Sequence, residues 1–86
     1  MNKYLRLPDE VINLHGYTTA EAGHILRQLF ERGESLHVRI IVGKGSHGTK
    51  GPIIRDFVKT YLASRNVRFS QSKLQDGGEG ALEVYL

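Results

Sequence analysis

The chain contains no cysteine and no tryptophan, and only one methionine and two prolines among its 86 residues. The lack of cysteine excludes disulfide bonds and thiolate metal sites, and it is typical of proteins from a reducing compartment. No apolar run is long enough to span a membrane. The first ten residues, MNKYLRLPDE, have no apolar signal core. We therefore expect a soluble, cytoplasmic protein, and its length predicts a single domain.

Acidic residues are scarce in the middle of the chain. Residues 36–75 carry eight lysines and arginines but only one acid, Asp56, whereas the flanking segments are net acidic. Solvation alone does not require this segregation of charge. An anionic partner explains it, and nucleic acid is the commonest anionic partner of a small basic domain. A solvated basic helix face is the alternative interpretation.

The first half of the chain predicts a strand, a helix and a second strand. Apolar and polar residues alternate over 10–14, which is typical of a short strand. Thr18 and Glu21 have the spacing of a capping box, so a helix is expected to begin at Thr18. Gly33 then provides a left-handed C-terminal cap. Residues 36–42, rich in β-branched side chains, predict the second strand.

The second half predicts a helix and two more strands. Gly51 and Pro52 suit the N-cap and first position of a helix, and Asn66 suits its C-terminal cap. Strands are expected at 67–72 and 81–86. The fold class is therefore a two-layer α/β sandwich of order βαβαββ, with a mostly parallel, mixed four-stranded sheet and both helices on one face. We expect residues 1–9 to form an N-terminal arm and residues 10–86 the domain.

A glycine-rich loop with two lysines follows the second predicted strand. If the first three strands are parallel, this loop meets the loops at 15–17 and 75–80 at one edge of the sheet, where α/β proteins bind ligands. The loop also leads into a helix N-terminus, which attracts anions. We predict that it binds phosphate through Gly43, Lys44, Gly45, Ser46, His47, Gly48 and Lys50. Supporting glycines are expected at Gly16, Gly77, Gly78 and Gly80.

Two nucleotide-binding motifs are excluded by their missing residues. Residues 43–48, GKGSHG, match a dinucleotide fingerprint, but no acid lies about twenty residues further on to hold a ribose. A P-loop is excluded because Thr49 follows Gly48 where lysine is required. A small-molecule nucleotide is therefore not the expected ligand.

Three motifs together resemble the small MutS-related (Smr) domain family. They are LHG with a following T-x-x-E-A helix start at 14–22, VGKG at 42–45 and GGEGALEVYL at 77–86. The resemblance implies a fold similar to the C-terminal domain of translation initiation factor three. It also implies binding of DNA or RNA, with phosphodiester endonuclease or nicking activity in DNA repair and recombination, or in ribosome rescue. The expected partners are DNA or RNA and, further, the ribosome, with no membrane.

One departure from the family pattern bears on catalysis. The family motif reads LDLHG, whereas this chain has Asn13 in place of the aspartate. The resemblance implies catalysis by His15 beside a degenerate Asn13. His47, in the glycine-rich loop, is a candidate for contacting phosphate or for carrying a second proton, and an exposed histidine without a role is the alternative. Two alternatives stay open: a binding module that lost cleavage with Asn13, and a purely protein-binding adaptor. His15 could equally serve to hold the glycine loop in place.

The sequence predicts no dedicated metal site and no certain cofactor. Asp76 and Glu79 are the only acids near the predicted edge, and they leave open a divalent ion such as Mg²⁺. A role as turn-forming residues is the alternative. Tyr17 is predicted either to stack on a base or to pack against the capped helix.

Overall fold

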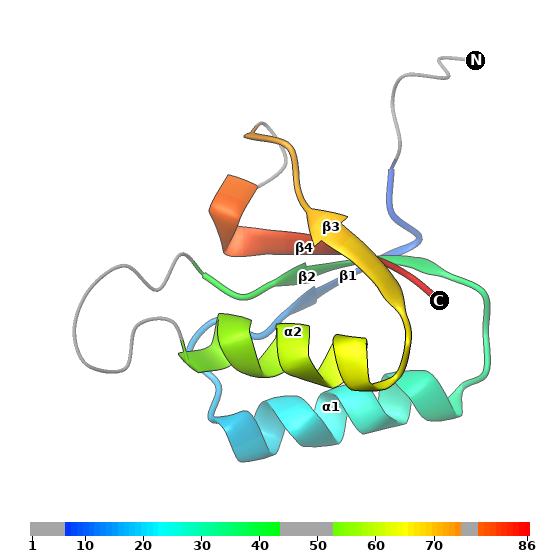
Figure 1. Ribbon diagram of the computed structural model, residues 1–86, viewed down its shortest axis with the longest axis horizontal. Helices are drawn as coiled ribbons and strands as arrows, with labels where there is room; N and C mark the ends of the chain where they lie inside the picture. The colour runs from blue at the N-terminus through cyan, green and yellow to red at the C-terminus, as the bar shows by residue number, and fades with distance from the viewer. Residues whose placement is uncertain (1–6, 44–52, 75–77) are drawn as a thin grey trace.

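The computed structural model describes residues 7–43, 53–74 and 78–86, without the side chains of Ile53 and Glu79. The elements follow the predicted order (Figure 1): β1 (Glu10–Asn13), α1 (Thr19–Glu31), β2 (His37–Ile41), α2 (Ile53–Ser64), β3 (Arg68–Gln71) and β4 (Ala81–Tyr85), with a short 3₁₀ turn, η2 (Gly78–Gly80), before β4. Among these described residues, no helix is long and apolar enough to cross a membrane.

The four strands form one mixed sheet in the order β1-β2-β4-β3. β1 and β2 pair in parallel, whereas β4 is antiparallel to both β2 and β3. Three strands therefore point the same way, which confirms the predicted α/β fold class. β3 does not lie beside β2, because β4 is inserted between them. This central position suits β4, whose residues Ala81–Val84 are all buried.

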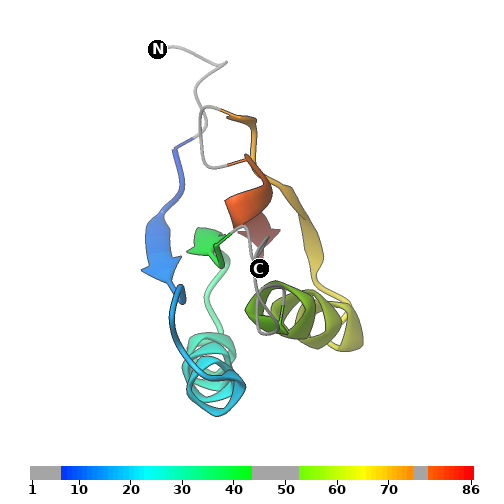
Figure 2. The same ribbon diagram turned by 90° about the vertical axis from the view of Figure 1, so that its left-hand side faces the viewer.

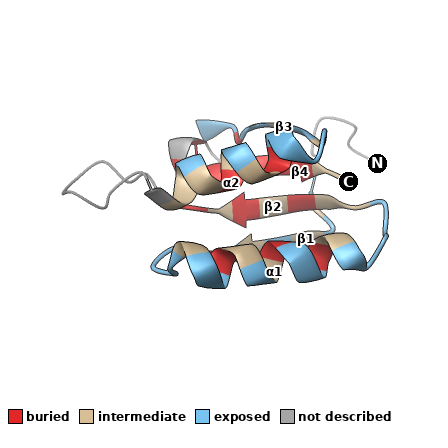
Figure 3. Cartoon of the chain, turned by 60° about the horizontal axis from the view of Figure 1, so that its bottom comes forward, coloured by how far each residue is buried: buried red, intermediate tan, exposed pale blue. Residues whose placement is uncertain are grey.

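Both helices cover the same face of the sheet, as predicted. Figure 2 shows α1 below β1 and β2, and α2 below β4 and β3. In Figure 3, the buried residues, drawn in red, lie on both helices and on β2 and β4. Among the described residues, the buried members of the core are aliphatic, and partly buried aromatic side chains pack against them. The buried members are Leu14, Ala22, Leu26, Leu29, Val38, Ile40, Val42, Val58, Leu62, Leu82 and Val84. Burial of this apolar surface is the main force that holds the two layers together.

Both ends of α1 are fixed, by the predicted capping box and glycine cap and by an ion pair that the sequence analysis did not predict. Thr18 is the N-cap, and it forms the complete capping box with Glu21. Gly33 follows the last turn with a φ of 64°, in the left-handed region. Both terminal nitrogens of Arg32 then donate hydrogen bonds to the carboxylate of Glu10, which connects the end of α1 to β1. These hydrogen bonds lower the pKa of Glu10.

A buried carboxylate lies on the helix-free face of the sheet. Leu82 and Val84 point toward the helices, so the intervening Glu83 points to the other side. Its carboxylate contacts His37 Nε2 at 2.5 Å and accepts a 2.7 Å hydrogen bond from Arg39 Nε. Ser72 Oγ donates a third bond. Burial raises the pKa of Glu83, but the three hydrogen bonds outweigh this effect, so the pKa is lowered.

Two stacked rings and a guanidinium lie side by side on the same face of the sheet, across three strands. The ring of His37 stacks on Tyr85 with 4.9 Å between centroids, and the guanidinium of Arg68 lies 5.2 Å from the Tyr85 centroid on the other side. The three residues are direct cross-strand neighbours on β2, β4 and β3. Arg68 is therefore held near the start of β3, at the edge opposite to the predicted loop cluster.

Candidate nucleic-acid interface

The carboxyl ends of β1, β2 and β3 open onto the same edge of the sheet, as predicted (Figure 1). We call the residues that gather there the loop edge: His15–Tyr17, Gly43 and Gly78–Gly80. Backbone hydrogen bonds connect them. Leu14 N–H donates to the Ile41 carbonyl at 2.7 Å, and the carbonyl of Gly80 accepts from Val42 at 2.8 Å and from Gly43 at 3.0 Å.

His15 is an exposed titratable side chain of the loop edge. Its ring packs against Gly43, since a Cβ added at Gly43 would overlap the Cδ2 atom of the imidazole. Gly43 also has a φ of 78°, which disfavours any other residue. The first motif and the glycine loop are thus in direct contact. This contact fits both interpretations of His15, as a proton carrier and as a support for the loop.

Asn13 fixes the backbone of His15. The Asn13 Oδ1 atom accepts a 2.9 Å hydrogen bond from the His15 N–H, two residues further on. This is a local side-chain-to-backbone turn, which asparagine and aspartate form equally well. Asn13 therefore keeps the geometry that an aspartate would give at this position, but it brings no negative charge.

The described glycines of the loop edge have backbone roles. Gly16 and Gly78 have φ values of 87° and 56°, both in the left-handed region that favours glycine, and their role as loop support stays a prediction. The Gly80 carbonyl holds the end of β2, as described above. The N–H of Gly43 donates to the Gly80 carbonyl, and Gly43 packs against the ring of His15. The contact of Gly43 with phosphate stays a prediction.

The other predicted phosphate-binding residues lie outside the described residues. These are Lys44, Gly45, Ser46, His47, Gly48 and Lys50. The predicted helix start at Gly51–Pro52, the support residue Gly77 and Asp76 also lie outside the described residues. The described flanks of that segment, Gly43 and Ile53, are both at the loop-edge end of the molecule (Figure 1). Of these two flanks, Gly43 is in contact with the ring of His15.

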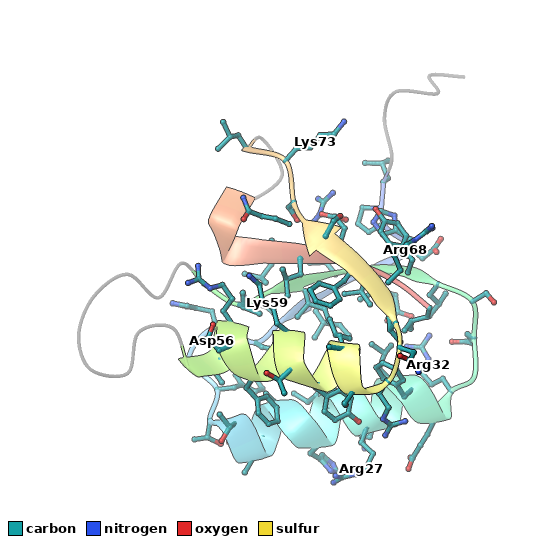
Figure 4. The ribbon with its side chains drawn as sticks, in the orientation of Figure 1. Arg27, Arg32, Asp56, Lys59, Arg68 and Lys73 are labelled. Carbon is teal, nitrogen blue, oxygen red and sulfur yellow. The ribbon has the colours of Figure 1, made fainter. Side chains whose placement is uncertain are left out.

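The cations of residues 36–75 that the structure describes do not form one surface. Arg39 bonds to Glu83 on the helix-free face, and Arg65 and Arg68 stack on aromatic rings at the far end of the sheet. Lys59 rises from α2 toward the sheet, and Lys73 follows β3 on the loop-edge side (Figure 4). Arg39, Arg65 and Arg68 therefore add no positive charge at the loop edge, although they count among the eight cations of residues 36–75.

A metal centre finds no support in the described part of the chain. No group of three or more histidines, aspartates and glutamates comes together there. His24 is exposed on α1, and His37 contacts Glu83. The side chain of Glu79, an open metal candidate, is not described.

Sequence reasoning missed one supporting residue, Glu83. Its carboxylate joins β2 to Ser72, the residue that leads from β3 into the loop before η2. Ser72 N–H also donates to the Ala81 carbonyl, which closes the base of that loop. The available signal was an acid between buried apolar residues in ALEVY, since such an acid needs partners inside the fold.

Comparison with known families and structures decides the family. The Smr domain profile matches residues 12–86. The chain belongs to the Smr domain family. The Smr domain of B3BP, in a solution structure, is 30% identical with a TM-score of 0.68, covering 88% of this chain and 76% of that one. The human small-MutS related domain is 31% identical with a TM-score of 0.67, covering 87% and 98%.

A bacterial structure supports the same assignment. The Smr domain of Thermus thermophilus MutS2 is 25% identical, with a TM-score of 0.70 over 90% of this chain and 98% of that one. A search of curated protein sequences gives no significant match. The resemblance carried by the three sequence motifs is therefore confirmed.

Proposed function

We propose that this Smr domain binds DNA or RNA at the loop edge, and that His15 moves protons in phosphodiester cleavage there. Family membership supports nucleic-acid binding, since Smr domains generally bind nucleic acids and some members nick them. The observation that carries the proposal is the contact of His15 with Gly43. It brings an exposed imidazole to the start of the basic, glycine-rich segment.

The proposed chemistry uses the RNA 2′-hydroxyl as an internal nucleophile. The 2′-oxygen attacks the adjacent phosphorus and the bond to the 5′-oxygen breaks, which leaves a cyclic phosphate. His15 takes the 2′-proton, and His47 or water protonates the leaving oxygen. Lys44 and the backbone of 45–48 stabilise the negative charge that develops on the phosphate. This route needs no metal ion and predicts a bell-shaped pH profile.

The structure also favours a second function, a binding module without cleavage. Asn13 already uses its side-chain oxygen to hold the His15 N–H, and it has no charge with which to raise the basicity of a neighbour or bind a metal. In this proposal the loop edge positions a nucleic acid or a ribosome, and the chemistry is absent because the carboxylate is absent.

A cleavage assay on matched RNA and DNA separates the two functions. The proteins to compare are the wild type, His15→Ala and Asn13→Asp, each with and without EDTA. RNA cleavage that persists in EDTA and is lost in His15→Ala supports the proton-transfer mechanism. Cleavage that appears only in Asn13→Asp supports the binding module. Asn13→Asp is a fair probe because aspartate can accept the same hydrogen bond from His15.

The binding step has its own test. If phosphates are contacted, the dissociation constant rises steeply with salt concentration, and Lys44→Ala weakens binding equally for all sequences. An affinity that does not respond to salt would instead indicate a protein-binding adaptor.

A further inference from the structure

A pocket lies at the end of the domain that is opposite to the loop edge. It is open to solvent, has a volume of about 230 Å³ and is lined by Leu29, Phe30, Glu34, Arg65, Val67 and Leu86. Leu29 is buried and forms the floor, whereas the other apolar side chains are only partly buried. In Figure 1 this is the end where both helices and β4 finish. Apolar walls that still face water are a feature of sites that take an apolar group.

The volume of the pocket fits one side chain. A cavity of about 150 Å³ lined by leucine, isoleucine and phenylalanine is large enough to bind benzene. A pocket of about 230 Å³ therefore accommodates a leucine or phenylalanine side chain. Four of the six lining residues are apolar and offer no side-chain hydrogen bonds, which disfavours a nucleobase, whose edge needs polar partners.

The two charged residues at the rim differ in their partners. Glu34 accepts a 2.7 Å hydrogen bond from Arg32 Nε, and it shares Arg32 with Glu10. Arg65 lies 5.0 Å from the centroid of Phe30 and donates to the Tyr61 hydroxyl at 3.0 Å. Among the described residues, no carboxylate pairs with Arg65. A held guanidinium with its charge unbalanced is complementary to a carboxylate.

The geometry points to a docking site for a protein segment that carries a leucine or phenylalanine side chain directly beside a carboxylate. The apolar side chain enters the pocket between Phe30, Val67 and Leu86, and the carboxylate meets Arg65 at the rim. α1, with 13 residues, is about 20 Å long and separates this pocket from the loop edge. A protein partner and a nucleic acid can therefore occupy the domain together, and the site is independent of the proposed nuclease function.

Three small probes separate the two parts of this site. N-Acetylphenylalanine carries the ring and the carboxylate, its amide carries the ring alone, and N-acetylglycine carries the carboxylate alone. Probes of this size reach about millimolar affinity at the efficiency of ordinary small ligands. Binding is followed by ¹H–¹⁵N NMR of the whole chain. The expected result is saturable shifts at the amides of Leu29, Phe30, Val67 and Leu86, with the acid binding about threefold tighter than the amide.

Variants test the role of Arg65. Arg65→Gln is expected to remove the preference for the acid and leave binding of the amide unchanged, whereas Arg65→Lys keeps part of the preference. Arg27→Gln is the matched control, because Arg27 is exposed on the side of α1 away from the sheet (Figure 4). It removes the same charge outside the pocket and is expected to change nothing.

Several outcomes would overturn the proposal. These are the absence of shifts at the pocket amides, equal binding of acid and amide by the wild type, or equal shifts with N-acetylglycine. Loss of the acid preference in Arg27→Gln would reduce the effect to general charge. Adenosine monophosphate that shifts the same amides more strongly than N-acetylphenylalanine would assign the pocket to nucleic acid instead.

Discussion

Glu83→Gln is the substitution whose effect on stability can be worked out most fully from the structure. The side chain of Glu83 is only 10% exposed, and those of His37 and Arg39 are 16% exposed. The carboxylate joins β4 to residues on both neighbouring strands or their extensions. Glutamine has nearly the same shape, so the substitution removes the negative charge while it leaves the packing in place.

The expected loss follows from the number of charge-assisted hydrogen bonds. A hydrogen bond to a charged group contributes roughly 1 kcal/mol more to stability than a neutral one. Three such bonds would give about 3 kcal/mol, and the easier burial of a neutral amide offsets part of this. We expect the free energy of unfolding at pH 7 to fall by about 2 kcal/mol, which corresponds to a decrease in Tm on the order of 10 °C for a domain of this size.

Urea denaturation followed by far-ultraviolet circular dichroism measures this loss. Glu10→Gln is the matched control, because Glu10 also pairs with an arginine but is 35% exposed in its side chain. Its effect is expected to be much smaller, since exposed ion pairs contribute little. If Glu83→Gln is no less stable than Glu10→Gln, the charge of Glu83 does not hold the strands together.

The pH dependence gives the same reasoning a second test. The pKa of Glu83 is lowered in the folded protein, so its contribution is fully present above the ordinary pKa of a glutamate, about 4.3. The contribution is lost as the pH falls below that value and through the folded pKa. The wild type and Glu83→Gln should therefore converge in stability between pH 5 and strongly acidic solution. A constant difference across this range would mean that lost charge is not the cause.

Two further predictions concern the glycines at positive φ and the cap of α1. Gly43→Ala should lower both stability and nucleic-acid affinity, because φ at Gly43 is positive and an added Cβ would displace the His15 ring. Gly33 also has a positive φ but lies in open space, so Gly33→Ala should lower the free energy of unfolding by about 1 kcal/mol and leave the affinity unchanged. Unfolding and binding titrations of both variants check this. Thr18→Ala should lower the free energy of unfolding by about 1 kcal/mol, whereas Thr18→Ser should stay close to the wild type. Equal losses in the two variants would show that the hydrogen bond from the Glu21 N–H to the Thr18 hydroxyl does not stabilise the helix.

Local signals in the sequence predicted the elements well. The capping box at Thr18 and Glu21 placed the start of α1 correctly, because the two residues that form it are three positions apart. Asn66, predicted as a cap, has a φ of 58° at the end of α2. The apolar stripes of both helices predicted which faces meet the sheet, and the two-layer arrangement followed from them.

Contacts between distant parts of the chain could not be predicted in the same way. The position of β4 between β2 and β3 depends on pairings that no local pattern specifies. The partners of Glu83 become neighbours only through that strand order. The packing of His15 on Gly43 likewise needs the parallel register of β1 and β2. The spread of the basic residues over opposite ends of the sheet also follows from topology rather than from their proximity in sequence.

The central place of β4 has a consequence for how the domain is made. β2 and β3 have no described pairing with each other, and β4 joins them. His37 meets Glu83 only across a separation of 46 residues. During synthesis, the sheet therefore stays open until Ala81–Tyr85 has left the ribosome, although both helices have already been made. A chain interrupted before that strand exposes the unpaired edges of β2 and β3, which are templates for aggregation.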